Sequence, residues 1–167
     1  MITLYNAISK DGYIAQEDSS EDFIPDVLWD EFVSLCKRYD YLVIGRKTYE
    51  TIQKYPSKEI KKLESFSINR IVITRNNSFK VKTEYTTVHS IEEILKLKGN
   101  ILVSSGPTLN TFLLKGGFVD EVMLNIIPIN INKGIKAFDL KPDLIFVSQE
   151  DRSDGRKLCV YQIKKID

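Results

Sequence analysis

The sequence predicts an α/β protein of three layers, in which helices cover both faces of a central, mostly parallel mixed sheet. Two observations carry this prediction. Short apolar runs typical of buried strands alternate with helix-period patterns as far as residue 128. Two more strand patterns, Leu144–Asp151 and Lys157–Lys165, then flank an Asp-Gly turn, which indicates an antiparallel C-terminal hairpin. A length of 167 residues suits one domain, so we expect residues 1–167 to form it.

The first strand is expected at Ile2–Ile8, an apolar opening that ends in the turn Ser9–Gly12. The polar run Gln16–Asp22 fits either a mobile loop over a site or a solvated connection. Pro25 and Asp26 indicate a helix start, because proline suits the first turn and an acid favours the positive end of the helix dipole. The core stripe of that helix is Leu28, Phe32, Leu35, Cys36 and Tyr39. Later strands are expected at Tyr41–Ile44, Arg70–Thr74 and Tyr85–Val88, and short helices at Thr48–Gln53, Lys58–Leu63 and Ile91–Leu95.

The stretch Asn100–Pro128 combines a strand, a turn and a helix. Ile101–Val103 suits a strand buried on both faces, and three small residues, Ser104–Gly106, follow it. Pro107 fits the first helical position, since its missing N–H would have no partner there. The expected helix face is Leu109, Phe112 and Leu113; Gly116-Gly117 ends the helix, Val119–Ile127 forms a strand, and Asn130–Gly134 is an irregular polar loop. Such a turn can bind an anion through free N–H groups, and a β-α connection without a ligand is an equal alternative.

Composition excludes several classes of function. The 24 basic and 23 acidic residues nearly balance, which disfavours a nucleic-acid or membrane surface. We see no signal peptide and no apolar run of membrane-spanning length. The two cysteines, Cys36 and Cys159, lie far apart and indicate buried thiols in a reducing, cytoplasmic compartment. No His/Cys/carboxylate cluster suits a metal, so none is expected.

Three predicted strands end in residues that suit phosphate binding. One ends at Gly45 and continues into Arg46, Lys47 and Thr48; one ends at Thr74 and continues into Arg75 and Asn76; the third ends at Ser104, Ser105 and Gly106. Ligands of open α/β sheets bind outside the carboxyl ends of the strands. If these strands are parallel, two arginines, a lysine and two helix N-termini meet at one edge. Such a site fits a ligand with several phosphates, although each arginine alone also fits a solvated charge.

Arginine binds phosphate through two parallel hydrogen bonds, which lysine cannot match. A dinucleotide with an extra 2′-phosphate would engage Arg46, Arg75 and the small-residue turn together, which favours NADPH over NADH. The Gly-x-Gly-x-x-Gly fingerprint and the phosphate-loop lysine motif do not occur. The lone histidine, His89, follows a strand and is interpreted as structural.

Two longer motifs resemble the dihydrofolate reductase superfamily. Val43-Ile44-Gly45-Arg46-Lys47-Thr48-Tyr49-Glu50 is very like the dihydrofolate reductase motif that grips the cofactor phosphates. Ser105-Gly106-Pro107-Thr108-Leu109, followed by Val119-Asp120-Glu121 and Pro128, is similar to the reductase domain of bacterial riboflavin biosynthesis. Ser9–Ala15 also looks like the exit of the family's first strand. The resemblance covers nearly the whole chain.

The resemblance implies a dihydrofolate reductase-like fold, NADPH, and hydride transfer to a C=N or C=O group of a pterin- or pyrimidine-like substrate. By position, Ala7 and Ile14 would frame the nicotinamide. The adenosine phosphates would be held by Gly45, Arg46, Lys47, Thr48, Thr74, Arg75 and Asn76, and the pyrophosphate by Ser105, Gly106, Pro107, Thr108 and Leu109. The resemblance also suggests that the terminal antiparallel strands pair between subunits, so a homodimer is possible.

The substrate side departs from the family. The usual glycine pair is Ser105-Gly106, Thr48–Pro56 does not match the arm that binds substrate phosphate in the riboflavin branch, and Asn130–Gly134 replaces a glycine-rich loop. For the proton that accompanies hydride transfer, Asp26 is the first candidate and Asp30 the second, and each also fits a helix-start acid or a solvated face. Asn125 aligns with a polar strand position that would bind substrate or water.

We therefore expect an NADPH-dependent reductase of a small heterocycle, and two substrates stay open: dihydrofolate and the ribosylaminopyrimidine of riboflavin synthesis, 5-amino-6-(5-phosphoribosylamino)uracil. The alternative in a different class is a module that binds NADPH as a sensor without turnover. It would keep Arg46, Arg75 and Gly106 but lack a proton source.

Overall fold

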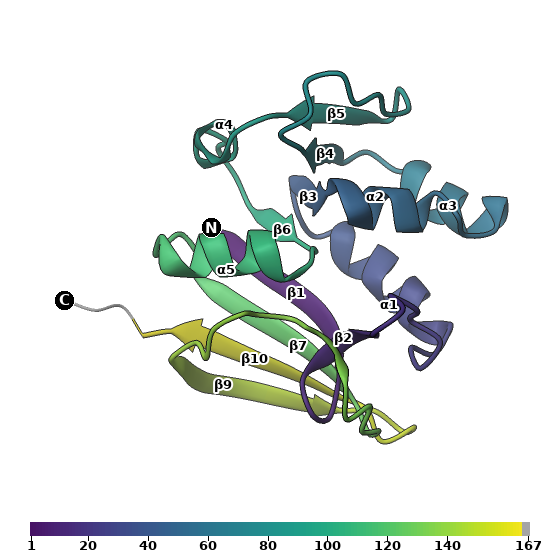
Figure 1. Ribbon diagram of the computed structural model, residues 1–167, viewed down its shortest axis with the longest axis vertical. Coiled ribbons are helices and arrows are strands. Elements are labelled where there is room, and N and C mark those ends of the chain that lie inside the picture. The colour runs from purple at the N-terminus through teal and green to yellow at the C-terminus, as the bar shows by residue number, and fades with distance from the viewer. Residues whose placement is uncertain (165–167) are drawn as a thin grey trace. The chain divides into compact units, whose positions relative to one another are not determined.

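The computed structural model describes residues 1–164 (Figure 1). Contacts divide the chain into two compact units. The central unit is Asp26–Ser104, and the terminal unit is Met1–Pro25 together with the described part of Ser105–Asp167. The central unit is therefore one continuous piece of chain, whereas the terminal unit draws on both of its ends. The single domain over residues 1–167 stays a prediction.

Four parallel strands form the sheet of the central unit, in the order β5-β4-β3-β6. They are β3 (Tyr41–Gly45), β4 (Asn69–Ile73), β5 (Tyr85–Val88) and β6 (Ile101–Val103). The apolar residues Leu42, Val43 and Ile44 are fully buried, as expected of a strand covered on both faces. The connecting helices are α1 (Val27–Cys36), α2 (Arg46–Ile52), α3 (Ser57–Glu64) and α4 (Ile91–Leu95).

Helix α1 buries the predicted stripe of Leu28, Phe32, Leu35 and Cys36, and it packs against α3. The Trp29 indole N–H donates a hydrogen bond of 2.9 Å to the Glu59 carbonyl oxygen, which joins the same two helices. Tyr39, predicted to continue the stripe, lies beyond the last residue of α1 and is only half-buried. Helix α2 packs on β3 and β4, so the residues that follow β3 are held at the end of the sheet.

A buried arginine joins β4 to the end of α3. Arg70 is 6% exposed, and its guanidinium donates to three main-chain carbonyl oxygens: Leu63 (Nε 3.0 Å, Nη2 2.6 Å), Phe66 (Nη2 2.5 Å) and Ile68 (Nη1 3.2 Å). It also lies 5.2 Å from the centroid of the Phe66 ring. These hydrogen bonds fix the connection between α3 and β4, which belongs to neither a helix nor a strand.

In the terminal unit, the sheet order is β1-β7-β10-β9. Strand β1 (Ile2–Ser9) is parallel to β7 (Glu121–Ile127), while β10 (Lys157–Ile163) is antiparallel to β7 and to β9 (Leu144–Asp151). The predicted C-terminal hairpin is confirmed, and the expected end of its second strand at Lys165 lies outside the described residues. Helix α5 (Pro107–Lys115) completes this unit.

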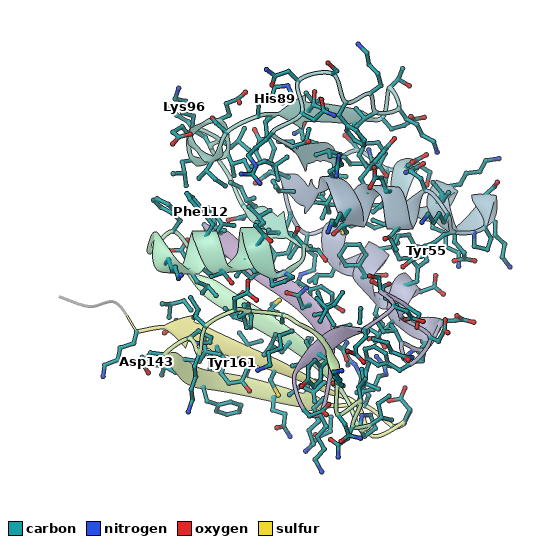
Figure 2. All side chains as sticks on the ribbon, in the orientation of Figure 1. Tyr55, His89, Lys96, Phe112, Asp143 and Tyr161 are labelled. Carbon is teal, nitrogen blue, oxygen red and sulfur yellow. The ribbon has the colours of Figure 1, made fainter. Side chains whose placement is uncertain are left out.

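The predicted face of α5 is wrong at one position. Leu113 is buried, but Phe112 is 53% exposed and projects from the helix (Figure 2). The buried face instead carries two polar residues, Asn110 and Thr111. Thr111 Oγ1 accepts a hydrogen bond of 2.9 Å from the Asp139 N–H, and Asn110 bonds to main chain and to β1. The hydrogen bonds of Asn110 and Thr111 place their side of the helix toward the protein interior. Apolar periodicity could not predict this orientation.

A second, two-stranded sheet pairs β2 (Tyr13–Gln16) with β8 (Gly134–Lys136). Of strand β8, only Gly134 was assigned a structure from the sequence, as the last residue of an irregular loop. A Cβ atom at Gly134 would overlap the Ala15 carbonyl oxygen, so this close pairing requires glycine. Among residues 1–164, no helix is long and apolar enough to cross a bilayer.

Candidate functional site

The carboxyl ends of three parallel strands coincide at one edge of the central unit. In the sheet register Gly45 pairs with Ile73, and Val43 pairs with Val103. Arg46 and Thr74 directly follow the first pair, and the Ser104 N–H donates a hydrogen bond of 3.0 Å to the Val43 carbonyl oxygen. The segments Gly45–Thr48 and Thr74–Asn76 therefore leave the sheet side by side, as parallel strands require.

The turn after β4 is held by hydrogen bonds of its own residues. Thr74 is 7% exposed, and its hydroxyl oxygen accepts a hydrogen bond of 3.2 Å from the Asn76 N–H. The Asn76 Oδ1 in turn accepts one of 2.9 Å from the Ser78 N–H. This local network leaves Arg75 exposed at the edge of the sheet. The arrangement presents a guanidinium to solvent on a fixed main chain.

His89, interpreted as structural, lies at the same edge (Figure 2). Its ring Nδ1 is 2.8 Å from the Thr74 carbonyl oxygen, and its main-chain N–H donates a hydrogen bond of 2.9 Å to Glu93 Oε1. Because a carbonyl oxygen only accepts, Nδ1 carries the proton in this contact. His89 thus holds the turn that carries Arg75. A lone histidine after a strand gave no signal of this neighbour, since the contact spans 15 residues.

Arg46 begins α2 and is exposed, with its Cζ 5.9 Å from the centroid of the Phe79 ring. The Phe79 ring packs edge-on against Tyr49, which is 7% exposed. Lys47 is also exposed and Thr48 is half-buried. Arg46 is therefore supported on an aromatic surface while its guanidinium stays accessible, which suits capture of an anion.

In the terminal unit, Gly106 is the N-cap of α5, with φ −82° and ψ −178°. The preceding Ser105 is 7% exposed, and its carbonyl oxygen accepts hydrogen bonds from Asn6 Nδ2 (2.9 Å) and Asn110 Nδ2 (3.0 Å). Pro107 occupies the first helical position, as predicted. The first main-chain N–H groups of the nine-residue helix α5 have no partner within a helix, which is the feature that suits an anion.

The predicted catalytic Asn125 and the predicted nicotinamide neighbour Ala7 are register partners on β7 and β1. Partners in a sheet point to the same face, so these two residues lie next to each other. Asn125 is 2% exposed, and Ala7 is the half-buried position of an otherwise buried strand. Ile14, the other residue expected at the nicotinamide, is half-buried on β2.

The two carboxylate candidates both lie in the central unit. Asp26 is the N-cap of α1 and is exposed, and its side chain makes no capping hydrogen bond. Asp30 is exposed, and its Oδ1 is 2.7 Å from Lys62 Nζ. Asp30 is therefore engaged in a surface ion pair, which fits the solvated face named as its alternative.

A carboxylate not singled out in the sequence organises the exit of β1. Asp11 accepts hydrogen bonds from the Ser9 hydroxyl (2.6 Å) and from the N–H groups of Ile131 (3.1 Å) and Asn132 (2.7 Å). The Ser9 hydrogen bond is the main cause that holds the pKa of Asp11 below its ordinary value, and the two main-chain bonds act in the same direction. Asp11 thus ties the β1–β2 turn to the loop before β8.

Comparisons with known proteins bear on the family and the fold of the chain. Residues 1–144 match the family described as the RibD C-terminal domain. The uncharacterized protein YyaP of Bacillus subtilis (strain 168) is 26% identical over 178 residues, covering 96% of this chain and 93% of YyaP.

Two solved structures are similar over their whole lengths. A putative riboflavin biosynthesis protein from Shewanella sp. PV-4 has a TM-score of 0.74 at 22% identity, covering 98% of this chain and 99% of that one. Dihydrofolate reductase from Enterococcus faecalis, in complex with NADP(H), has a TM-score of 0.71 at 18% identity, covering 99% and 97%. At such identities the likeness shows the fold alone, and the predicted dihydrofolate reductase-like α/β fold is confirmed.

Proposed function

The chain belongs to the RibD C-terminal domain family, and from that membership we propose that it is an NADPH-dependent reductase of a small pterin- or pyrimidine-like heterocycle. One observation carries the cofactor proposal. Two exposed arginines, Arg46 and Arg75, follow neighbouring parallel strands at the carboxyl edge of the central unit. Forked guanidinium groups at such an edge suit a 2′-phosphate, which NADPH has and NADH lacks.

Each unit contributes its own part of the proposed cofactor contacts. In the central unit, Arg46, Lys47, Thr48, Thr74, Arg75 and Asn76 would bind the adenosine phosphates. In the terminal unit, Ser105–Leu109 at the start of α5 would bind the pyrophosphate through main-chain N–H groups. A Cβ atom added at Gly106 would meet no atom within 4 Å, which supports the approach of a phosphate to that main chain. When bound, the cofactor supplies the hydride.

The substrate-side residues proposed are Asn125 and Asp26. Positioning supplies most of the rate of a hydride transfer, since the reacting carbons must lie within about 3–3.5 Å of each other. Asn125 is the register partner of Ala7, and its amide would hydrogen-bond the heterocycle or a water. Asp26 would supply the proton, and its replacement by asparagine should then reduce turnover.

A binding titration followed by a turnover assay tests this function. Purified protein is titrated with NADPH and with NADH while cofactor fluorescence is recorded, and NADPH oxidation is then followed with dihydrofolate and with the ribosylaminopyrimidine. Binding of NADPH with turnover of one compound supports the reductase. Binding without oxidation across pterins, pyrimidines and quinones supports the sensor module instead, and binding of neither cofactor contradicts both.

Gly106→Ala separates cofactor binding from folding. Alanine adopts the φ and ψ of Gly106 without strain, and its methyl group would meet no protein atom. We expect the free energy of unfolding to change by no more than about 0.5 kcal/mol. The methyl group would stand where a phosphate approaches, so we expect the NADPH Kd to rise by about tenfold, or 1.4 kcal/mol. Urea denaturation and fluorescence titration measure the two effects, and an unchanged Kd would contradict pyrophosphate binding at this turn.

Asn125→Leu should reduce turnover without reducing cofactor affinity. Leucine has the same number and branching of side-chain heavy atoms as asparagine but offers no hydrogen bond to a substrate or a held water. Loss of such a contact in the transition state typically costs about 10²-fold or more in kcat. We expect the NADPH Kd to stay within about twofold. A thermal melt checks that the variant is folded, and equal kcat values would remove Asn125 from the proposed site.

We also propose a homodimer formed through the terminal strands. Strand β9 is the outer strand of its sheet, and its Ile145, Phe146 and Val147 are 49%, 57% and 49% exposed. Exposed apolar edge strands favour pairing with another strand. Light scattering on the purified chain measures the mass.

A further inference from the structure

We propose that Asn6 and Asn110 are positioning residues for the cofactor, because this buried amide pair aims the Gly106 N–H at the pyrophosphate. The inference rests on the proposed function. Both residues lie in the terminal unit, Asn6 on β1 and Asn110 on the buried face of α5. Neither was singled out in the sequence, and neither is placed in contact with the cofactor or the substrate.

Burial and hydrogen bonds hold the side chains of Asn6 and Asn110 in fixed positions. Asn110 is fully buried and Asn6 is 7% exposed. Asn110 Nδ2 lies 2.8 Å from Asn6 Oδ1, 3.0 Å from the Ser105 carbonyl oxygen and 3.1 Å from the Ala137 carbonyl oxygen. Asn6 Nδ2 donates a second hydrogen bond, of 2.9 Å, to the same Ser105 oxygen. Two side-chain amides therefore converge on one carbonyl group.

The convergence sets the direction of the next N–H. Ser105 C=O and Gly106 N–H belong to one peptide unit, and in a trans peptide they point in opposite directions. Holding the oxygen toward the buried amide pair therefore turns the Gly106 N–H away from it. Among residues 1–164, no group accepts a hydrogen bond from that N–H, while the Gly106 carbonyl oxygen accepts one of 3.2 Å from the Asn110 N–H. The N–H is thus oriented and available for an anion.

The energetics indicate that stability alone does not account for Asn110. Its Oδ1 is buried and has no hydrogen-bond donor among the described residues. A buried polar atom without a partner is unfavourable, so the amide is held here at a cost in stability. The Asn110 amide also bonds to Asn6, which is next to Ala7 on β1. The pair therefore links the Ser105–Gly106 turn to the strand that is proposed to contact the nicotinamide.

Two ligands separate positioning from a general loss of structure. NADPH would use the α5 turn and the arginines, whereas 2′-AMP has no pyrophosphate and would use the arginines of the central unit alone. For Asn110→Leu we expect an NADPH Kd at least tenfold higher, equivalent to 1.4 kcal/mol, and a 2′-AMP Kd within about twofold of the wild type. The matched control is Thr111→Val on the same helix, which removes the hydrogen bond that the Asp139 N–H donates to Thr111 and does not touch Ser105. We expect it to leave both constants unchanged.

The outcomes are distinct. If Asn110→Leu binds NADPH as the wild type does, the inference is overturned and the proposed function stands. If Asn110→Leu and Thr111→Val lose NADPH and 2′-AMP alike, the effect is general and the inference is again overturned. If the wild type binds neither ligand, the proposed function itself fails. Should Asn110→Leu not fold, Asn110→Ser is used, since serine cannot reach both oxygen atoms and causes less steric change.

Discussion

Replacement of Arg75 by alanine should weaken NADPH binding by about 10–100-fold, while the affinity for NADH stays within about twofold. A hydrogen bond to a charged group contributes about 1.5–3 kcal/mol, and a guanidinium facing a 2′-phosphate makes one or two of them. NADH has a hydroxyl at that position and loses little. Because the Thr74–Asn76 turn is fixed by its own hydrogen bonds, the truncation should not disturb the main chain.

Arg46→Ala should have an effect of similar size on NADPH, and the double variant should bind NADPH and NADH with similar affinity. Arg38→Ala is the matched control. It removes the same charge from the same unit, but Arg38 precedes β3 and so lies toward the opposite edge of the sheet. Fluorescence titrations at fixed ionic strength give the constants. If Arg38→Ala weakens NADPH as much as Arg75→Ala does, net charge and not a phosphate contact is responsible.

Arg70→Met should lower the free energy of unfolding by about 3–5 kcal/mol. The substitution keeps a side chain of similar length but leaves the carbonyl oxygens of Leu63, Phe66 and Ile68 without this donor. A loss of that size is a large part of the 5–15 kcal/mol typical of a whole domain. Arg70→Lys should recover only part of it, since a single ammonium cannot reach all three oxygens in their fixed geometry.

Urea denaturation measures this effect, and Cys36 offers a second readout. Burial raises the pKa of the Cys36 thiol to about 12, so in the folded state it does not react with a thiol reagent at neutral pH. Faster labelling of Cys36 in Arg70→Met than in the wild type would report more frequent opening of the central unit. The control Arg38→Met, at an exposed position, should change stability by no more than about 0.5 kcal/mol. Equal stability of Arg70→Met and the wild type would contradict the role given to these bonds.

The sequence allowed the strands and helices to be predicted where local patterns decide them. Apolar runs located β3, β4 and β6, and Pro107 located the start of α5, because burial on both faces and helix-start chemistry act over a few residues. The short strand β8 was missed. Its three residues carry no period, and its pairing depends on Ala15 in a distant part of the chain.

The site was predicted at the level of strand ends but not at the level of its support. Arg46 and Arg75 could be found because each follows a recognisable strand. The contacts of His89 with Thr74 and of Asn110 with Asn6 could not be found, since they join residues 15 and 104 positions apart. Phe112 was wrongly assigned to the core, because helical periodicity counts apolar residues and gives no weight to a buried amide such as that of Asn110. The roles of Asn125 and Asp26 stay predictions.

The division of the chain into one continuous and one discontinuous unit has a consequence during protein synthesis. All residues of Asp26–Ser104 are synthesised before the second segment of the terminal unit begins. Strand β1, by contrast, precedes the central unit in the chain but pairs with β7, where Thr3 meets Glu121. At about 5–20 residues per second, that partner arrives roughly 6–24 s later. Strand β1 must wait for that time without its partner β7, and a slow translation step after residue 104 would lengthen its exposure to aggregation and to chaperones.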